Sequence, residues 1–166
     1  MEVTMKEIMD KDQLSRTLKR IAHEIIERND DLSNLILVGI LNKGYSVAKI
    51  LQGNIHRFSD VEVPLYAIDI TNYRDDLKQN NDQKNTFDST GKNVLLIDDV
   101  LFTGRTVRAA MDALIDTGRP SKIELAVLID RGHRELPIRA DFVGKNIPTS
   151  KDEKVYFDVN EMKVYF

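Results

Sequence analysis

Mainly apolar runs and segments with helical periodicity alternate along the chain. Helical spacing is clearest at Leu14, Leu18, Ile21 and Ile25, which together predict a helix over residues 10–29. Similar spacing predicts two further helices, over residues 45–58 and 104–117. The apolar runs predict buried strands at residues 35–41, 64–70, 94–99 and 123–129. Strands that alternate with helices predict an α/β fold, in which a mainly parallel sheet is flanked by helices.

Polar segments follow the predicted strands. The longest covers residues 72–92, and a loop of that length in a compact domain is usually a functional lid or a disordered segment. Shorter strands are predicted after the last long one, at residues 141–144, 154–159 and 163–166. Because ligands bind beyond the carboxyl ends of parallel strands, the polar segments at those ends are candidates for one shared site. They are residues 42–44, 71–74, 98–106 and 130–134.

The composition narrows the class of protein. The chain has 166 residues, of which 42% are apolar, and this is enough for one domain with a hydrophobic core. No run reaches the roughly 18 apolar residues of a membrane span, and the N-terminal segment lacks the apolar region of a signal peptide, so we expect a cytoplasmic protein. Cysteine is absent, which excludes disulfides and cysteine-bound zinc. The net charge of −3 argues against an evenly basic nucleic-acid binder but allows a local basic patch.

Residues 94–106 carry the densest candidate chemistry. The predicted strand ends in Asp98 and Asp99, whose carboxylates can accept hydrogen bonds from sugar hydroxyls and hold a hydrated magnesium ion. Residues 103–106 form a turn before a helix, whose unpaired N–H groups and dipole attract a phosphate, and Gly104 permits close approach of the backbone. Alone, two acids before a turn also suit an ordinary structural connection, but the ordered combination predicts a sugar-phosphate site. No GxxxxGK[ST] or GxGxxG pattern supports a P-loop or dinucleotide site.

These thirteen residues resemble the phosphoribosyl-pyrophosphate (PRPP) motif of type I phosphoribosyltransferases. Other segments extend the resemblance over roughly residues 10–157, namely residues 20–24, 68–71, 73–77, 130–141 and 144–150. Together they are similar to the bifunctional pyrimidine operon regulators that also have uracil phosphoribosyltransferase activity. The resemblance implies a type I phosphoribosyltransferase fold in a single domain over residues 1–166. It also implies a lid loop at about residues 72–92 and a small hood built from the N-terminal segment and residues 142–166.

The resemblance implies a reaction in which uracil and PRPP form UMP and pyrophosphate. An oxocarbenium-like transition state makes positioning and charge stabilisation the main tasks of the protein. The ribose hydroxyls are assigned to Asp98 and Asp99, and magnesium arrives with PRPP, bridged to these carboxylates through water and not held by direct protein ligands. The 5′-phosphate is assigned to Thr103, Gly104, Arg105 and Thr106. The pyrophosphate is assigned to Asn42, Lys43 and Gly44.

Base recognition and lid closure are assigned by the same resemblance. Phe102 and Val143 match the base-binding segments, and purine-salvage relatives have an Asp at the position of Phe102, so an aromatic ring there favours a pyrimidine. Packing of Phe102 on its neighbours is an equally good interpretation. The lid is expected to begin at Tyr73, Arg74 and Asp75 and to exclude water from PRPP.

The pyrophosphate loop departs from the family pattern. Family members usually have Thr-Arg-Gly where this chain has Asn42, Lys43 and Gly44, and Leu41 replaces a polar or basic residue. Lysine lacks the planar bidentate grip that arginine offers a pyrophosphate. The predicted lid is also several residues shorter than usual. We therefore expect weaker turnover, with nucleotide binding retained.

The resemblance also implies that the protein binds a hairpin in the leader RNA of pyrimidine genes and favours termination of transcription. UMP or UTP strengthens that binding in the family. The matching RNA-binding residues are Lys19, Arg20, His23, Arg28, His133, Arg134, Arg139 and Lys145. Periodicity alone would assign the charged face of the first helix to solvent. A homodimer or larger homo-oligomer is expected to join patches that are small on one subunit, and neither DNA nor a membrane is an expected partner.

Three hypotheses for the function remain open. The first is a regulator that binds RNA and also makes UMP, and the second is a purely regulatory RNA-binding protein whose transferase site only senses nucleotide. The third is a purine-salvage enzyme without RNA function, against which Phe102 and the arginine-rich residues 131–139 count. A measurement of UMP formation separates the first two.

Overall fold

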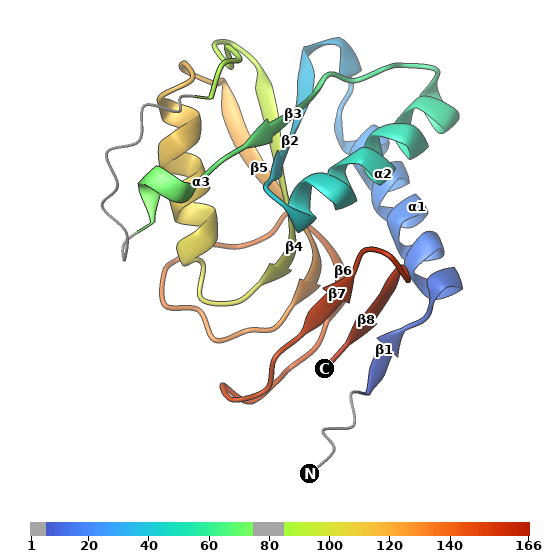
Figure 1. Cartoon of the computed structure of the whole chain (residues 1–166). Coiled ribbons are helices and arrows are strands. Elements are labelled where there is room, and N and C mark those ends of the chain that lie inside the picture. Colours follow the sequence, from blue (N-terminus) through green and yellow to red (C-terminus); the bar gives the residue numbers. More distant parts are fainter. Residues whose placement is uncertain (1–5, 75–84) are drawn as a thin grey trace.

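Five parallel strands form the centre of the molecule, in the order β3-β2-β4-β5-β6. The structure is a computed structural model that describes residues 6–74 and 85–166 (Figure 1). The strands of this main sheet are β2 (Leu35–Ile40), β3 (Leu65–Ile68), β4 (Asn93–Leu101), β5 (Lys122–Asp130) and β6 (Phe142–Asn146). Each neighbouring pair is parallel. The predicted α/β fold with a parallel sheet is confirmed.

Helices cover both faces of the main sheet, because successive residues of a strand point to opposite sides. The helices are α1 (Lys11–Arg28), α2 (Lys43–Ser59) and α3 (Arg105–Ile115). Leu37 and Leu95 face α1 and α2 in one core, whereas Val38 and Leu96 face α3 in the other (Figure 1). Burial on both faces explains why β2 and residues 94–97 of β4 are continuously apolar in sequence.

Helix α1 agrees closely with the helix predicted over residues 10–29. Asp10 is the N-cap, and a capping box joins it to Gln13: the Asp10 carboxylate accepts from the Gln13 N–H at 2.8 Å, and the Gln13 side chain accepts from the Asp10 N–H at 2.9 Å. Asn29 is the C-cap, so the prediction differs from the helix only by its two caps. Within the described ranges, no helix is long and apolar enough to cross a membrane.

A second sheet, here called the small sheet, joins segments from the two ends of the chain. It contains β1 (Glu7–Met9), β8 (Lys163–Tyr165) and β7 (Tyr156–Asp158), antiparallel and in the order β1-β8-β7. In Figure 1 it lies at the bottom of the molecule, beyond the end of β4. The segment 142–166 is therefore divided, since β6 belongs to the main sheet and β7 and β8 to the small one.

Helix α2 begins earlier than the sequence predicts. The sequence predicted a helix from residue 45, but Lys43 and Gly44 already belong to the first turn of α2, behind the N-cap Asn42. A Cβ on Gly44 would lie 2.6 Å from the carbonyl oxygen of Ile97 and 3.0 Å from the Cα of Asp98. Only glycine allows this start of α2 to press so closely against the end of β4.

Candidate active site

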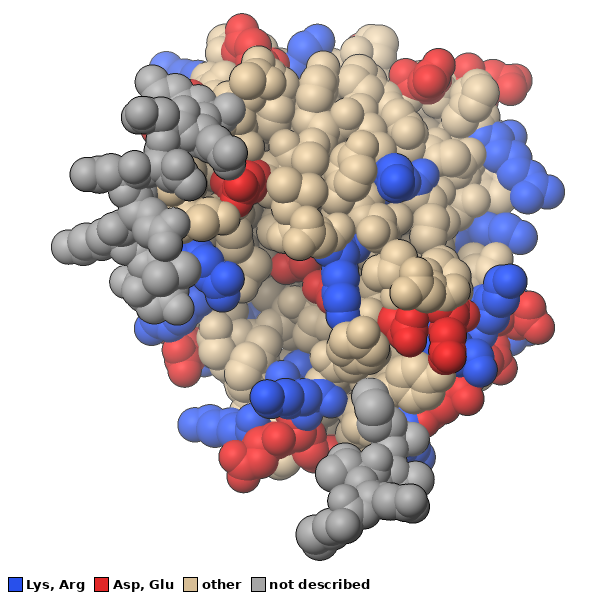
Figure 2. Space-filling model, viewed as in Figure 1, with Lys and Arg blue, Asp and Glu red and all other residues tan. Residues whose placement is uncertain are grey.

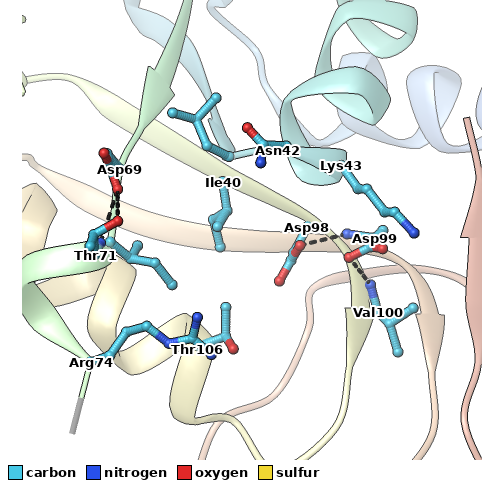
Figure 3. A pocket seen from close by; sticks show the side chains of 12 residues that line it. Ile40, Asn42, Lys43, Asp69, Thr71, Arg74, Asp98, Asp99, Val100 and Thr106 are labelled. Carbon is cyan, nitrogen blue, oxygen red and sulfur yellow. Dashed lines mark hydrogen bonds between the residues drawn. The ribbon is translucent and has the colours of Figure 1, made fainter. Parts of the chain in front are cut away.

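A cavity of about 500 Å³ opens where β2, β3 and β4 end and where α2 and α3 begin (Figure 3). On the face seen in Figure 2, a hollow near the middle of the molecule brings acidic and basic side chains together. Three separate strand ends thus contribute to one site, as expected for a parallel sheet. The sequence-predicted residues that line the cavity are Asn42, Lys43, Arg74, Asp98, Asp99 and Thr106.

Asp98 and Asp99 end the buried part of β4 in different surroundings. Asp98 is only 6% exposed, and its Oδ1 accepts a 2.8 Å hydrogen bond from the backbone N–H of Asp99. Asp99 is half-buried, and its Oδ1 accepts a 2.8 Å hydrogen bond from the N–H of Val100 (Figure 3). Burial, followed by the charge of Asp99, raises the pKa of Asp98 well above its ordinary value. Cations or hydroxyl donors that bind here would stabilise the charged form of both acids.

The first turn of α3 contributes Thr106 to the cavity. Gly104 is the N-cap of α3 with a φ of 95°, a left-handed conformation that favours glycine. The Oγ1 of Thr103 accepts a 3.2 Å hydrogen bond from the N–H of Arg105. The Arg105 side chain pairs with Glu135 at 2.8 Å, and both side chains are about half exposed. Such an exposed ion pair contributes less than about 1 kcal/mol to stability.

The first turn of α2 faces the cavity from the opposite side. Asn42 makes no side-chain capping bond, so the first N–H groups of α2 stay available to an anion. The Lys43 ammonium lies 3.6 Å from the centroid of the Tyr156 ring, on β7 of the small sheet. Tyr156 was not assigned from the sequence, where no local pattern sets it apart.

Asp69 and Thr71 also line the cavity and were not assigned to a role from the sequence. The Asp69 Oδ1 accepts hydrogen bonds from the hydroxyl and the N–H of Thr71, at 2.6 and 3.0 Å (Figure 3). These bonds, the hydroxyl first, lower the pKa of Asp69. The available signal was position alone, since Asp69 lies near the end of the strand predicted at residues 64–70 and Thr71 begins the polar segment at residues 71–74.

The predicted lid is described only at its two ends. Tyr73 closes the short helical turn η2 (Thr71–Tyr73), and its hydroxyl donates to the Oδ2 of Asp116 just after α3. This bond is the main reason that the pKa of Tyr73 rises to about 12. Arg74 lines the cavity. Asp75, the third predicted lid residue, lies outside the described residues.

The two residues assigned to the base, Phe102 and Val143, are not among those that line the cavity. The Phe102 ring centroid lies 4.0 Å from the guanidinium carbon of Arg131 and 5.5 Å from the ring of His133. Phe102 therefore packs on its neighbours, which is one of the two interpretations of its aromatic ring. Val143 lies on β6 at an edge of the main sheet, where its carbonyl oxygen accepts from Arg20 at 3.2 Å.

The phosphoribosyl transferase domain family matches residues 4–161 of the chain. The Bifunctional protein PyrR of Actinobacillus pleuropneumoniae (serotype 5b) is 56% identical over 90% of this chain and 87% of its own length. The Bifunctional protein PyrR of Caldicellulosiruptor bescii is also 56% identical, over 94% of this chain and 89% of its own length. The chain belongs to the PyrR family. The prediction of a bifunctional phosphoribosyltransferase of this family is confirmed.

Solved phosphoribosyltransferases share the fold of this PyrR family member. The hypoxanthine phosphoribosyltransferase of Staphylococcus aureus has a TM-score of 0.73 at 22% identity, covering 90% of this chain and 79% of that one. The hypoxanthine phosphoribosyltransferase of Trypanosoma cruzi, in complex with the product IMP, has a TM-score of 0.68 at 20% identity, covering 90% and 81%. At this identity the likeness concerns the fold alone, and the predicted type I phosphoribosyltransferase fold is confirmed.

Arg20, assigned to RNA by resemblance to the PyrR family, makes contacts inside the subunit. Its Nη2 donates to the carbonyl oxygen of Gly144 at 2.6 Å and to that of Val143 at 3.2 Å. Its Nη1 pairs with Glu24 one turn further along α1, at 2.6 Å. Arg20 thus fastens α1 to the edge strand β6, where the base-binding candidate Val143 lies.

The other RNA candidates on α1 differ from one another. Arg28 pairs with Glu124 at 3.5 Å, and the His23 ring stacks on Phe58 with 4.1 Å between centroids. Lys19 makes no hydrogen bond or ion pair with any described residue. Figure 2 shows lysine and arginine side chains scattered along the edge formed by α1 and α2, with acidic side chains between them. On the face shown, the lysine and arginine side chains along this edge do not form a continuous basic patch.

Arg134 is held by its own loop. Its guanidinium donates to the carbonyl oxygens of Phe102 at 2.6 Å and Ile138 at 2.9 Å, and it pairs with the carboxylate of Asp130. The side chain is 24% exposed. These bonds connect the residues around 130–138 to the end of β4, so Arg134 has a structural role whether or not RNA also contacts it.

The remaining RNA candidates lie in the segment after β5 and on β6. His133 has a positive φ of 62°, and its Nε2 contacts the carbonyl oxygen of Thr149. Arg139 and Lys145 are exposed and make no ion pair within the described part of the chain. Lys145 lies on β6 and borders, with Arg16 of α1, a second cavity of about 230 Å³. These two exposed cations are the candidates of this group whose side chains a phosphate can reach.

Proposed function

We propose that the chain is a uridine-nucleotide-dependent RNA-binding attenuator of pyrimidine gene transcription that also converts uracil and PRPP to UMP and pyrophosphate. The observation that carries the proposal is the meeting of Asp98, Asp99 and the first turns of α2 and α3 around one cavity. The 56% identity to proteins named Bifunctional protein PyrR supports the same conclusion.

Positioning of PRPP follows from the polar groups around the cavity. The carboxylates of Asp98 and Asp99 accept hydrogen bonds from the two ribose hydroxyls. The 5′-phosphate lies at the start of α3, among the backbone N–H groups and hydroxyls of residues 103–106. The pyrophosphate lies at the start of α2, where Asn42, Gly44 and the charge of Lys43 meet it. This arrangement exposes C1 of the ribose to uracil and stabilises the charge that leaves with pyrophosphate.

The carboxylate pair fits a magnesium ion that arrives with PRPP. Over residues 6–74 and 85–166, no group of three or more His, Cys, Asp or Glu side chains could hold a metal ion. Hydrated Mg²⁺ commonly uses one or two carboxylates beside substrate phosphates, which matches Asp98 and Asp99. When bound, the ion offsets negative charge on the pyrophosphate. The raised pKa of Asp98 would fall in its presence, because a nearby cation favours the charged carboxylate.

Base binding and water exclusion complete the transferase site. Phe102 supplies an apolar wall and the backbone of Val143 supplies hydrogen-bonding groups for uracil. We assign the whole chain, residues 1–166, to one domain, with a lid over about residues 72–92 and a hood that includes the small sheet. Closure of this lid, which begins at Tyr73 and Arg74, keeps water from C1 of PRPP.

The regulatory activity uses polar groups of α1, of the segment after β5 and of β6. Lys19, Arg139 and Lys145 contact phosphates of a leader-RNA hairpin, whereas His23 and His133 offer rings and ring nitrogens for its bases. Uridine nucleotide binds near Val143 of β6, and Arg20 connects the same strand to α1. A homodimer or larger homo-oligomer joins the basic groups of two subunits into one RNA-binding surface.

Two assays test the proposal. Steady-state turnover with uracil, PRPP and magnesium measures UMP formation, and a gel-shift titration of a pyrimidine leader hairpin with and without UMP measures regulation. We expect UMP formation and an RNA affinity that UMP raises about 5- to 150-fold. Absence of UMP formation together with nucleotide-dependent RNA binding would select the purely regulatory hypothesis. Failure to bind PRPP, UMP and RNA would reject both.

A purely regulatory RNA-binding function, without UMP formation, is the second candidate function, and one structural observation supports it. Lys43 stands where family members usually have arginine, and its ammonium lies on the Tyr156 ring of the small sheet. A single ammonium offers pyrophosphate fewer directed hydrogen bonds than a guanidinium does. If the parent forms UMP slowly and Lys43→Arg forms it faster, Lys43 is the cause of the slow turnover.

A further inference from the structure

The small sheet reaches the candidate active site through one contact. The Lys43 Nζ lies 3.6 Å from the centroid of the Tyr156 ring, whereas the other cation–ring distances within the described residues run from 4.0 to 5.9 Å. Tyr156 is the first residue of β7, and it is 46% exposed. Tyr156 is therefore not a core residue, and its ring lies against the ammonium of Lys43, which lines the cavity.

The position of Lys43 makes this contact relevant to the cavity. Lys43 lines the cavity together with Asp98 and Asp99, yet in the described structure it forms no ion pair with either acid. In Figure 3 its side chain runs beside Asp99, on the side away from Asp69 and Thr71. An aromatic face attracts an ammonium without neutralising its charge, so the lysine keeps its full charge for an anion.

A lysine in this position loses conformational entropy when it binds a ligand, and an aromatic partner can reduce that loss. Its ammonium is a point charge on a four-carbon stem with many rotamers, whereas an arginine fork is planar and preorganised. Holding the ammonium at one place before the ligand arrives lowers the conformational entropy lost on binding. Tyr156 is in the right place to do this, because it contacts Lys43 from the small sheet and is not among the residues that line the cavity.

We propose that Tyr156 is a positioning residue for Lys43, and that its ring holds the ammonium at the edge of the cavity where the pyrophosphate of PRPP binds. The inference rests on the proposed function, which assigns pyrophosphate to the first turn of α2. It makes the small sheet part of the PRPP site, although Tyr156 itself makes no contact with the reacting atoms.

A double-mutant cycle on ligand affinity tests this role. The affinities of magnesium–PRPP and of magnesium–pyrophosphate are measured by calorimetry for the parent, Tyr156→Ala, Lys43→Ala and the double variant. Removal of the ring should weaken both affinities roughly two- to fivefold in the parent, as expected for a partly exposed cation–ring pair. In the Lys43→Ala background the same removal should have no effect, because Tyr156 acts only through Lys43. Tyr156→Phe, which keeps the ring, should bind both ligands with affinities near those of the parent.

A matched control separates positioning from damage to the small sheet. Tyr165 pairs with Tyr156 across β7 and β8, but its hydroxyl bonds to Glu161. Tyr165→Ala should leave the ligand affinities unchanged, even where it lowers the thermal midpoint. Equal losses in both lysine backgrounds, or equal losses from Tyr165→Ala, would overturn the positioning role. A parent that binds ligand but forms no UMP would reject only the transferase part of the proposed function, and a parent that binds neither ligand would reject both.

Discussion

The cavity at the end of β4 and the RNA candidates around α1 and β6 are built in different ways. The cavity collects side chains that follow three parallel strands, and six of the residues assigned to PRPP or the lid line it together. The RNA candidates come from one helix, one loop and an edge strand, and several of them bond to their own subunit. Among these, Arg20 holds β6, and Arg134 holds the carbonyl oxygen of Phe102.

This difference separates two kinds of polar residue. A residue placed by sheet topology near a strand end, such as Asp99, lines the ligand cavity, and its carboxylate accepts a hydrogen bond from the next residue of the same strand. A residue on a surface assembled from several elements, such as Arg134, often supplies the bonds that assemble it. A loss of RNA binding on mutation is therefore weaker proof of RNA contact than a loss of turnover is of PRPP contact. The following experiments would break or sharpen this contrast.

Substitution at the acidic end of β4 should have the largest effect. Asp99→Asn keeps the shape of the side chain and removes the charge that holds the ribose hydroxyls and the ion carried by PRPP. Loss of one such preorganised electrostatic group should lower kcat for UMP formation about 100- to 1000-fold. Steady-state kinetics measure this effect, and binding of leader RNA without nucleotide should stay at the parental level. Turnover at the parental level would show that Asp99 has no role at the reacting centre.

Asp98 should show the cost to stability of keeping an acid in the cavity. Because burial and the charge of Asp99 raise its folded-state pKa, the charged form is less stable in the fold than in the unfolded chain. The contribution of protonated Asp98 to the free energy of unfolding is fully present below its pKa in the unfolded chain, near 4. It is lost as the pH rises through its pKa in the folded protein. Asp98→Asn stays neutral, so it should lose turnover and gain thermal stability at pH 7–8.

The gain should shrink as the pH is lowered toward 4, where the parental Asp98 is itself protonated. Thermal midpoints of parent and variant between pH 4 and 8, without ligand, measure the difference. A variant that is less stable than the parent at neutral pH would mean that the charged carboxylate stabilises the ligand-free fold. The cavity would then resemble the RNA candidates, whose polar groups support the structure.

Substitution of Gly44 should change both the stability of the fold and the affinity for PRPP, through steric contact alone. The Cβ of Gly44→Ala would lie 2.6 Å from the carbonyl oxygen of Ile97, so the start of α2 must move away from β4. We expect about 1–3 kcal/mol less stability and a PRPP affinity lowered roughly tenfold or more. Denaturant unfolding and calorimetry measure the two effects.

Gly53 provides the matched control within the same helix. A Cβ there meets nothing within 4 Å, and the residue lies in the interior of α2. Gly53→Ala should therefore raise stability by about 0.5–1 kcal/mol and leave PRPP binding unchanged. If both substitutions altered PRPP binding equally, the effect would belong to the helix as a whole and not to its contact with Asp98.

Sequence patterns predicted those parts of the molecule that depend on local order. Four strands of the main sheet and the acid pair at the end of β4 follow from apolar runs, β6 from the short strand predicted at residues 141–144, and α1 from helical spacing. Strand β1 could not be predicted, because three residues form a strand only by pairing with β8 at the other end of the chain. The contact of Tyr156 with Lys43 and the hold of Arg20 on β6 depend on tertiary structure in the same way.

Arg134 and Arg139 should distinguish support of the fold from contact with RNA. Arg134→Ala leaves the carbonyl oxygens of Phe102 and Ile138 and the carboxylate of Asp130 without their donor, which should cost about 1.5–3 kcal/mol of stability. UMP formation should fall along with RNA binding, because Phe102 loses its anchor. Arg139→Ala, at an exposed position, should change stability by less than about 0.5 kcal/mol and weaken only RNA binding. Equal stability of the two variants would remove the structural role given to Arg134.

Lys145 should give the smallest effect and the cleanest measure of a phosphate contact. It is exposed on β6 beside the cavity that Arg16 also borders. Lys145→Ala should weaken binding of the leader hairpin severalfold and reduce the slope of log affinity against log salt by about 0.7–0.9, with no change in stability or UMP formation. Lys122→Ala removes the same charge at the opposite end of the main sheet, where Lys122 begins β5 and pairs with Glu124. An equal change of slope in both variants would mean that RNA responds to the net charge of the subunit and not to a surface at β6.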